Sequence, residues 1–177
     1  FRSPGLFEQA DGGTVLLDDV DSLSLPLQQK LVHFLQEKQF TRVHGHKPVR
    51  ADVRLITSTS GDPIDAVQTG ELLKSLYYQL AVHCIVLPPL RERREDILPL
   101  ADHFIRQGNE RYGLNVEGLA DDVQEAFLAY DWPGNVRELE TVIDETLEMM
   151  DEGETITFDH LPASFRMKLA PDAPKTD

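Results

Sequence analysis

The spacing of hydrophobic and polar positions differs between the two halves of this chain. In the first half, short apolar runs alternate with amphipathic segments, a pattern typical of an α/β fold. The apolar runs predict strands at residues 15–17, 52–60 and 83–87. We expect the first and third to be buried, and the first to be covered on both faces of a parallel sheet. Between them, the spacing predicts a helix over 26–37, a hairpin over 40–50, and two helical pieces over 64–82 that break at Gly70.

The second half has a helical period throughout. Helices are predicted over 95–112, 119–130 and 136–150, with Gly113 and Gly153 ending the first and third and Asn135 as a candidate cap of the third. One face of the third helix is apolar: Leu139, Val142, Ile143, Thr146 and Leu147. Residues 156–165 suggest a short extended piece and a last half-helix, and 170–177 resembles a linker or tail. We therefore expect a separate helical subdomain after the α/β part.

Composition narrows the functional classes. The chain has 177 residues, 41% of them hydrophobic, so a packed core is possible and global disorder is not expected. A formal charge of −14 disfavours nucleic-acid or anionic-membrane binding by this chain alone. A single cysteine, Cys84, cannot form an internal disulfide and is expected to be buried and inert. No secretory leader or long apolar span is apparent, which favours a cytoplasmic protein with no membrane partner.

Candidate chemistry centres on residues 10–21, ADGGTVLLDDVD. Asp18 and Asp19 follow an apolar strand, where open α/β sheets place their ligands. In phosphate chemistry the first acid would help to hold Mg²⁺, and the second would orient or deprotonate a water molecule. The alternative is a core strand that ends in a solvated acidic turn.

Three other features have two interpretations each. The hydroxyls at residues 57–60 either contact a phosphate or a bound water, or cap the helix that Asp62 and Pro63 would start. His44 and His46 have no third ligand nearby, so a solvated turn is favoured over a metal site. Arg137, one turn into the third helix, either pairs with neighbouring glutamates or reaches a phosphate.

Several strings together resemble the central domain of sigma-54-dependent bacterial transcription activators, a branch of the AAA+ ATPases. FEQADGGTVLLDDVDSL resembles the Walker B region, DVRLITSTS the sensor I strand, and LYYQL part of the finger helix; LPPLRERREDI and YDWPGNVRELE resemble the start of the lid and the sensor II motif. The similarity runs from about Gly5 to Leu161. It implies a partial AAA+ P-loop NTPase core over 1–89, a helical lid with sensor II over 90–168, and a tail over 169–177.

The resemblance also implies a mechanism and partners. Family members bind ATP between the subunits of a ring, usually a hexamer, and use hydrolysis to remodel sigma-54 RNA polymerase, often within two-component signalling. Asp18 matches the Mg²⁺-associated acid and Asp19 the catalytic position. Nucleotide-binding positions are Gly12, Gly13, Thr14, Asp18, Asp19, Thr59, Ser60 and Arg137, the last matching the sensor II arginine.

The sequence departs from the family at four of its functional positions. Asp19 replaces a usual Glu, Ser60 a usual Asn, and Leu73 and Gln79 stand at two usual arginines. In phosphoryl transfer a lost arginine finger can cost about three to five orders of magnitude in rate. No G-x-x-x-x-G-K-[ST] phosphate loop occurs, and neither does the sigma-contacting GAFTGA loop or a helix-turn-helix for DNA.

From these departures we expect this chain to be a fragment that starts within a longer protein and does not hydrolyse ATP alone. We also expect exposed apolar edges where neighbouring strands are lacking, with self-association or aggregation as a consequence. Two alternatives to an ATP-hydrolysing activator remain open. One is a regulatory module on a degenerate AAA+ scaffold that binds nucleotide or a partner without productive hydrolysis, and the other is a segment that serves only oligomerisation.

Overall fold

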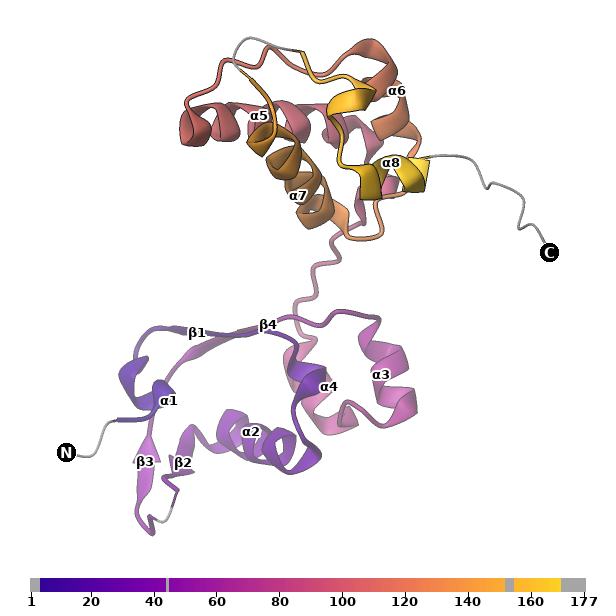
Figure 1. Ribbon diagram of the computed structural model, residues 1–177. Coiled ribbons are helices and arrows are strands. Elements are labelled where there is room, and N and C mark those ends of the chain that lie inside the picture. Colours follow the sequence, from indigo (N-terminus) through magenta and orange to yellow (C-terminus); the bar gives the residue numbers. More distant parts are fainter. Residues whose placement is uncertain (1–3, 44, 152–154, 170–177) are drawn as a thin grey trace. The chain divides into compact units, whose positions relative to one another are not determined.

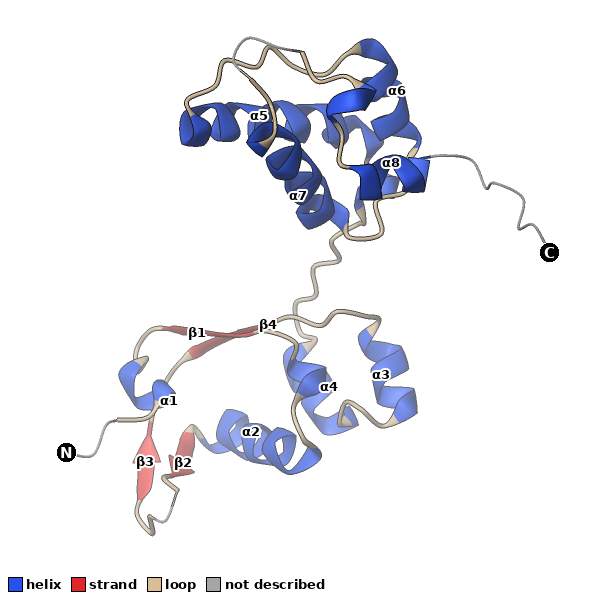
Figure 2. Cartoon of the chain, viewed as in Figure 1, coloured by secondary structure: helices blue, strands red, loops and turns tan. Residues whose placement is uncertain are grey.

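The computed structural model describes residues 4–43, 45–151 and 155–169, and divides the chain into two compact units. The first unit is Phe1–Ile85 and the second is Val86–Asp177. Strands are drawn in the first unit, and the second consists of helices and connecting segments (Figures 1 and 2). The predicted fold class, a parallel sheet with flanking helices followed by a helical lid, is confirmed.

A pair of parallel strands forms the sheet of the first unit. β1 (Thr14–Leu17) pairs with β4 (Arg54–Thr57), with Val15 opposite Leu55 and Leu17 opposite Thr57. Val15, Leu17 and Leu55 pack against the buried cluster, which includes Leu31 and Phe34 of α2 (Leu25–Glu37).

The prediction that β1 is buried on both faces is wrong. Burial alternates along both strands, and the outward side chains of Leu16 and Ile56 are 65% and 47% exposed. The reason is that the described chain covers one face of this sheet and leaves the other open. The apolar run therefore forms a half-buried strand rather than a central one.

The predicted hairpin is present as β2 (Gln39–Thr41) and β3 (Pro48–Arg50), which pair antiparallel. Of the two histidines in its turn, His44 lies outside the described residues. Beside the hairpin lies α1 (Leu6–Gln9), and the rings of Phe7, Phe34 and Phe40 contact one another across these elements. This aromatic cluster attaches the hairpin to the helical layer.

Two short helices follow β4, as predicted. α3 (Pro63–Thr69) is capped by Asp62, whose Oδ1 accepts a hydrogen bond of 2.8 Å from the N–H of Ile64. It ends at Gly70, which has a φ of 82° that favours glycine. α4 (Lys74–Leu80) then packs against α2 through Leu76, which is fully buried.

The predicted third strand, residues 83–87, is absent from the described structure. Ile85, Val86 and Leu87 are 85%, 83% and 82% exposed, and Cys84 is exposed rather than buried. An apolar run forms a strand only when another strand supplies hydrogen-bond partners, and none is paired with this segment.

Among its described residues, the second unit is built from four α-helices. They are α5 (Ile97–Tyr112), α6 (Asp121–Ala129), α7 (Asn135–Glu148) and α8 (Ala163–Leu169). Two 3₁₀ turns, Leu90–Glu92 and Arg94–Asp96, precede the first of these helices, and a third, Phe158–His160, precedes the last. The predicted apolar face of the third helix is confirmed, because the buried residues of α7 are Leu139, Val142, Ile143, Thr146 and Leu147. An isolated parallel bridge between Leu119 and Ile156 closes the unit.

Gly108 allows α5 and α7 to approach closely. A Cβ atom at this position would meet the Cδ1 atom of Leu147 on α7. Because Gly108 has no side chain, α5 and α7 can lie close together at this crossing.

Asn135 does not cap α7, contrary to the prediction. It is the first residue of the helix, with a φ of 52°, and its Oδ1 accepts a hydrogen bond of 2.9 Å from the N–H of Leu90. Asn135 therefore ties the start of α7 to the start of the second unit. Gly153, predicted to end this helix, lies outside the described residues.

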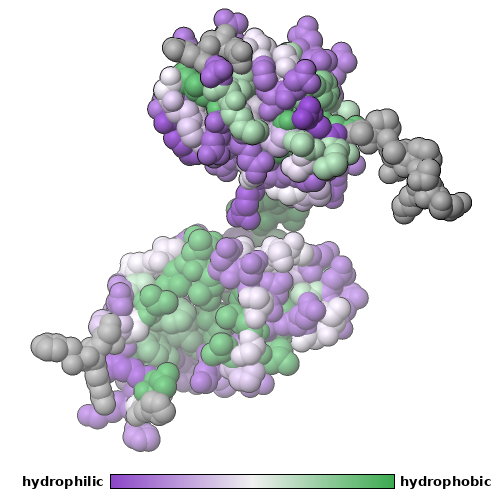
Figure 3. Space-filling model, viewed as in Figure 1, coloured by the Kyte–Doolittle hydropathy of each residue, from purple (hydrophilic) through white to green (hydrophobic). Residues whose placement is uncertain are grey.

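The surfaces of the two units differ in character. In the view of Figure 3, hydrophobic residues gather over the first unit between β1 and α2, while hydrophilic residues cover much of the second. Within the described residues, no helix is both long and apolar enough to cross a membrane.

Candidate functional site

The two acids lie at the carboxyl end of β1, as the sequence predicts. Asp18 directly follows the strand, and Asp19 has a left-handed backbone with φ 49° and ψ 58°. Both residues are exposed. Aspartate tolerates this conformation better than most residues, and here it turns the chain sharply into the 3₁₀ turn at Val20–Ser22.

Ser58, at the end of β4, contacts both acids. Its Oγ donates a hydrogen bond to Oδ1 of Asp18 and accepts one of 3.0 Å from the N–H of Asp19. Two backbone hydrogen bonds of 3.0 Å join the same segments, from the N–H of Ser58 to the Leu17 carbonyl and from the N–H of Val20 to the Ser58 carbonyl. Ser58 thus belongs to the acidic site, although the sequence pattern does not distinguish it in any way from the other hydroxyls at the end of this strand.

The carbonyl group of Asp19 is held as well. It accepts hydrogen bonds of 2.7 Å from Oγ and 2.9 Å from the N–H of Ser22. The N–H and the carbonyl of Asp19 therefore both have partners. This bonding stabilises the left-handed turn, which would otherwise cost about 1 kcal/mol or more.

Gly12, Gly13 and Thr14 lie at the opposite end of β1 from the acids. The N–H of Gly12 donates to the carbonyl of Asp52 at 2.7 Å, and the carbonyl of Gly13 accepts from Arg54 at 2.8 Å. At about 3.3 Å per residue, Gly13 and Asp18 are separated by roughly 16 Å along the strand. The structure therefore does not bring these three positions together with Asp18 and Asp19, and their role in nucleotide binding stays a prediction.

The two predicted sensor I residues follow Ser58. Oγ1 of Thr59 donates to the carbonyl of Gly61 at 3.0 Å, and Ser60 is exposed. Helix capping, which we considered for these hydroxyls, is performed instead by Asp62. Thr59 and Ser60 thus lie beside the acidic end of the sheet without a hydrogen bond to the acids.

The finger-helix positions Leu73 and Gln79 lie at either end of α4. Leu73 is its N-cap residue, and Gln79 is half-buried, with an Oε1 atom that is buried and has no hydrogen-bond partner. The start of α4 is fixed by Gln28 of α2, which is fully buried. Gln28 donates to the carbonyls of Leu23 and Glu71 at 2.8 and 2.7 Å, and its Oε1 accepts from the N–H of Leu73 at 2.8 Å.

Arg137 belongs to the second unit, one turn into α7. It is exposed, and its side chain has no ion pair or hydrogen bond among the described residues. It lines an open groove of about 440 Å³ between α7 and α8, together with Thr141, Phe165 and Lys168. The surface pairing of Arg137 with neighbouring glutamates, one of its two interpretations, is therefore not formed among the described residues. Its contact with a phosphate stays a prediction.

The carboxylate of Glu138, the next residue, accepts hydrogen bonds from several groups of the second unit. Its Oε1 accepts from Nζ of Lys168 at 2.8 Å and from the hydroxyl of Tyr130 at 3.2 Å, and its Oε2 accepts from the N–H of Gly134 at 2.9 Å. Burial raises the pKa of Glu138, but the hydrogen bonds from Lys168 and Gly134 outweigh it, so the pKa lies below its ordinary value. The hydrogen bond to Glu138 in turn raises the pKa of Lys168.

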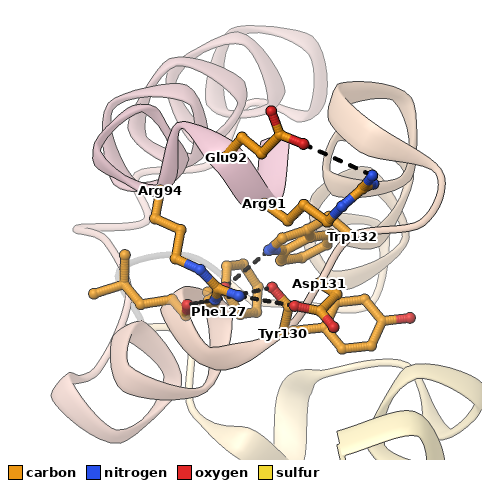
Figure 4. Close-up of polar contacts among 8 residues, drawn as sticks. Arg91, Glu92, Arg94, Phe127, Tyr130, Asp131 and Trp132 are labelled. Atoms are coloured by element: carbon orange, nitrogen blue, oxygen red, sulfur yellow. Dashed lines mark hydrogen bonds and ion pairs between the residues drawn. The ribbon is translucent and has the colours of Figure 1, made fainter. Parts of the chain in front are cut away.

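The segment before α5 is anchored by Arg94 (Figure 4). Its guanidinium donates to the carbonyl of Leu128 at the end of α6 and, at 2.8 Å, to Oδ1 of Asp131. Beside it, the fully buried ring of Trp132 donates its Nε1–H to the carbonyl of Phe127 at 2.8 Å. These contacts shape the turn that leads into α7 and thereby position Arg137.

The donor set at the end of β1 fits one kind of metal better than others. No cluster of three or more His, Cys, Asp or Glu side chains occurs within the described residues, so a site with several protein ligands is not present there. Mg²⁺ keeps most of its waters and is commonly held by one or two carboxylates plus substrate phosphates. Asp18 and Asp19 suit that requirement.

Comparison with known proteins gives matches along nearly the whole chain. Residues 1–86 match the model of the sigma-54 interaction domain, and residues 91–177 match that of an AAA+ ATPase lid domain. The transcriptional activator RocR of Bacillus subtilis is 50% identical over 175 residues, which are 98% of this chain and 38% of RocR. The nitrogen fixation protein AnfA of Azotobacter vinelandii is 44% identical over 162 residues, covering 92% of this chain and 30% of AnfA.

Solved structures give the same result. Crystal structures of NtrX from Brucella abortus match with a TM-score of 0.84, at 34% identity in complex with ADP and 33% in complex with ATP. The matches cover 91% and 94% of this chain, and 38% and 40% of NtrX. The chain thus spans about two fifths or less of the length of these relatives.

Proposed function

The chain belongs to the central AAA+ domain family of sigma-54-dependent bacterial transcription activators, and on that basis we propose that it couples ATP to remodelling of sigma-54 RNA polymerase. In this proposal the chain supplies the acidic end of the nucleotide site and the lid of a longer regulator. The observation that carries it is the pair Asp18 and Asp19 at the carboxyl end of β1, held by Ser58.

Each residue has a distinct task in this proposal. Asp18 would hold Mg²⁺ through its carboxylate, and Asp19 would orient the water molecule that attacks the nucleotide. Arg137, whose side chain has no ion pair or hydrogen bond within the described residues, would meet a phosphate of a bound nucleotide. When bound, Mg²⁺–ATP supplies the bond that is cleaved and the charge that these groups recognise.

Partners and location follow from the same family membership. We propose self-association into a ring, contact with sigma-54 RNA polymerase through a loop that is not in this sequence, and DNA binding only through a domain that is also not in it. A cytoplasmic location fits a partner of RNA polymerase. For the 177-residue chain alone we propose no ATP hydrolysis, because its sequence has no phosphate loop.

A second candidate is supported by α4. Leu73 and Gln79 stand where the family resemblance places two arginines, and neither side chain carries a charge. Such a module would bind nucleotide and regulate transcription without productive hydrolysis. The loss of arginine fingers is worth about three to five orders of magnitude in rate, which is enough to separate the two candidates in a standard assay.

Steady-state ATP hydrolysis by the full-length protein that carries this chain tests the proposal. We expect Mg²⁺-dependent turnover that Asp18→Asn abolishes and that Ser24→Ala, a change at an exposed serine with no cap hydrogen bond, leaves intact. ATP binding without turnover would favour the second candidate. The absence of both binding and turnover would refute both.

A further inference from the structure

Ser58 is the one side chain of the described residues that forms hydrogen bonds with both acids of the proposed site. We propose that Ser58 is a positioning residue, which sets the orientation of Asp18 and Asp19 before nucleotide arrives. This inference rests on the proposed nucleotide site. It assigns a role to a hydroxyl that the family resemblance did not mark.

The single proton of the Ser58 hydroxyl is already used by Asp18. A serine hydroxyl can donate once and accept twice. The proton of Ser58 is committed to Oδ1 of Asp18, and one lone pair accepts the N–H of Asp19. Ser58 therefore has no proton left to donate to a phosphate, and its influence on the reaction passes through the acids.

The hydrogen bond from Ser58 leaves one carboxylate oxygen of Asp18 open. Oδ2 of Asp18 has no hydrogen bond among the described residues, and the side chain is exposed. The hydroxyl thus restricts the rotation of the carboxylate while leaving one oxygen free for a metal-bound water. Removal of a residue that orients a metal-ligating carboxylate typically lowers metal affinity or activity by about 10- to 100-fold.

Asp19 depends on the same hydroxyl. Its left-handed backbone is held on one side by Ser58 and on the other by Ser22, so the direction of its side chain depends on the same hydroxyl. The backbone hydrogen bonds between Ser58, Leu17 and Val20 keep this hydroxyl in register with the acids. One substitution at Ser58 should therefore disturb both acids without touching either.

The test has two independent readouts. The first is a double-mutant cycle of Ser58→Ala and Asp18→Ala, measured by chemical unfolding. We expect Ser58→Ala to lower the folding equilibrium constant about fivefold when Asp18 is present and by less than about twofold when it is not. Equal effects in both backgrounds would show that the hydrogen bond does not exist in solution and would overturn the inference.

The second readout is ATP hydrolysis by the full-length protein as a function of Mg²⁺ concentration. We expect Ser58→Ala to lower kcat, or to raise the Mg²⁺ concentration for half-maximal activity, by about tenfold. Ser58→Thr, which keeps the hydroxyl, should restore most of the loss, and Ser24→Ala should have no effect. A wild-type rate and Mg²⁺ dependence in Ser58→Ala would mean that the contact is only structural, and this too would overturn the inference.

The two readouts separate this inference from the proposed function. If the wild-type protein neither binds nor hydrolyses ATP, the proposed function fails. Ser58 then has no positioning role in ATP hydrolysis, even if the double-mutant cycle shows a coupling energy between Ser58 and Asp18. If the wild-type protein is active and the coupling or the kinetic effect is missing, only the inference about Ser58 fails.

Discussion

Replacing Gln28 by alanine should destabilise the first unit more than any other polar substitution on α2. Gln28 is fully buried and makes three hydrogen bonds, to the carbonyls of Leu23 and Glu71 and from the N–H of Leu73. Its removal leaves all three backbone groups without a partner inside the protein. At about 1 kcal/mol for each group, Gln28→Ala lowers the free energy of unfolding by about 3 kcal/mol.

Urea unfolding measures this loss. With a urea dependence of about 1.5 kcal/mol per molar, the midpoint of the first unit should fall by about 2 M. The only tryptophan, Trp132, lies in the second unit, so its fluorescence follows that unit and serves as an internal reference. Hydrogen exchange of peptides from α2 and α4 follows the first unit directly.

Two further variants sharpen the test. Gln29→Ala, at an exposed neighbouring position on the same helix, should change stability by less than about 0.5 kcal/mol. Gln28→Glu keeps an acceptor for Leu73 but loses the donors to the two carbonyls, so it should be destabilised at neutral pH. Protonation of the carboxyl should restore only part of the stability, because a single O–H can donate to only one of the two carbonyls. A loss below about 1 kcal/mol in Gln28→Ala, or equal losses in Gln28→Ala and Gln29→Ala, would refute the reasoning.

The second unit supports three more predictions. Gly108→Ala should destabilise the second unit by about 1–3 kcal/mol in urea unfolding, because the new methyl group meets Leu147. This cost outweighs the better helix propensity of alanine. A stabilised variant would contradict the close approach of α5 and α7. Glu138→Gln should flatten the dependence of the free energy of unfolding on pH. The lowered pKa of Glu138 in the folded state stabilises the protein at pH values above the ordinary pKa of 4.5. This stabilisation is lost as the pH falls through the folded-state pKa. An unchanged pH profile would rule out this role. Arg94→Ala should lower the free energy of unfolding by about 1–2 kcal/mol, because it leaves the carbonyl of Leu128 unpaired. Arg94→Lys should recover little of this loss, because lysine lacks the planar guanidinium fork. Full recovery by lysine would argue against this role of Arg94.

Local patterns predicted much of the helical structure correctly. The apolar face of α7, the break at Gly70 and the start of α3 after Asp62 all follow from periodicity or from the conformation of one residue type. These features depend on neighbours within a few positions along the chain. Sequence is therefore sufficient to find them.

Features that depend on distant partners were not predictable in the same way. The run at 85–87 has strand-forming residues, yet it pairs with no strand, and the outer face of β1 has no covering layer in the described chain. Burial of an apolar run depends on what packs against it, which its own pattern does not specify. The prediction of buried strands failed at both places for this reason.

The candidate site shows the same division. The position of Asp18 and Asp19 after an apolar strand was predictable, because strand ends follow from the pattern. The contact with Ser58 was not, because 40 positions separate Ser58 from Asp18 and only the register of β1 against β4 brings them together. A parallel pairing of the two predicted strands would have been the signal to look for.

Opening of a sigma-54 promoter is the most direct test of the proposed function. The assay follows conversion of the closed complex by the full-length protein, with ATP, with a non-hydrolysable analogue, and with the Asp18→Asn variant. We predict that opening requires hydrolysable ATP and is lost in Asp18→Asn. Opening without ATP, or equal opening by Asp18→Asn and wild type, would contradict the assignment of this site as the source of the remodelling energy.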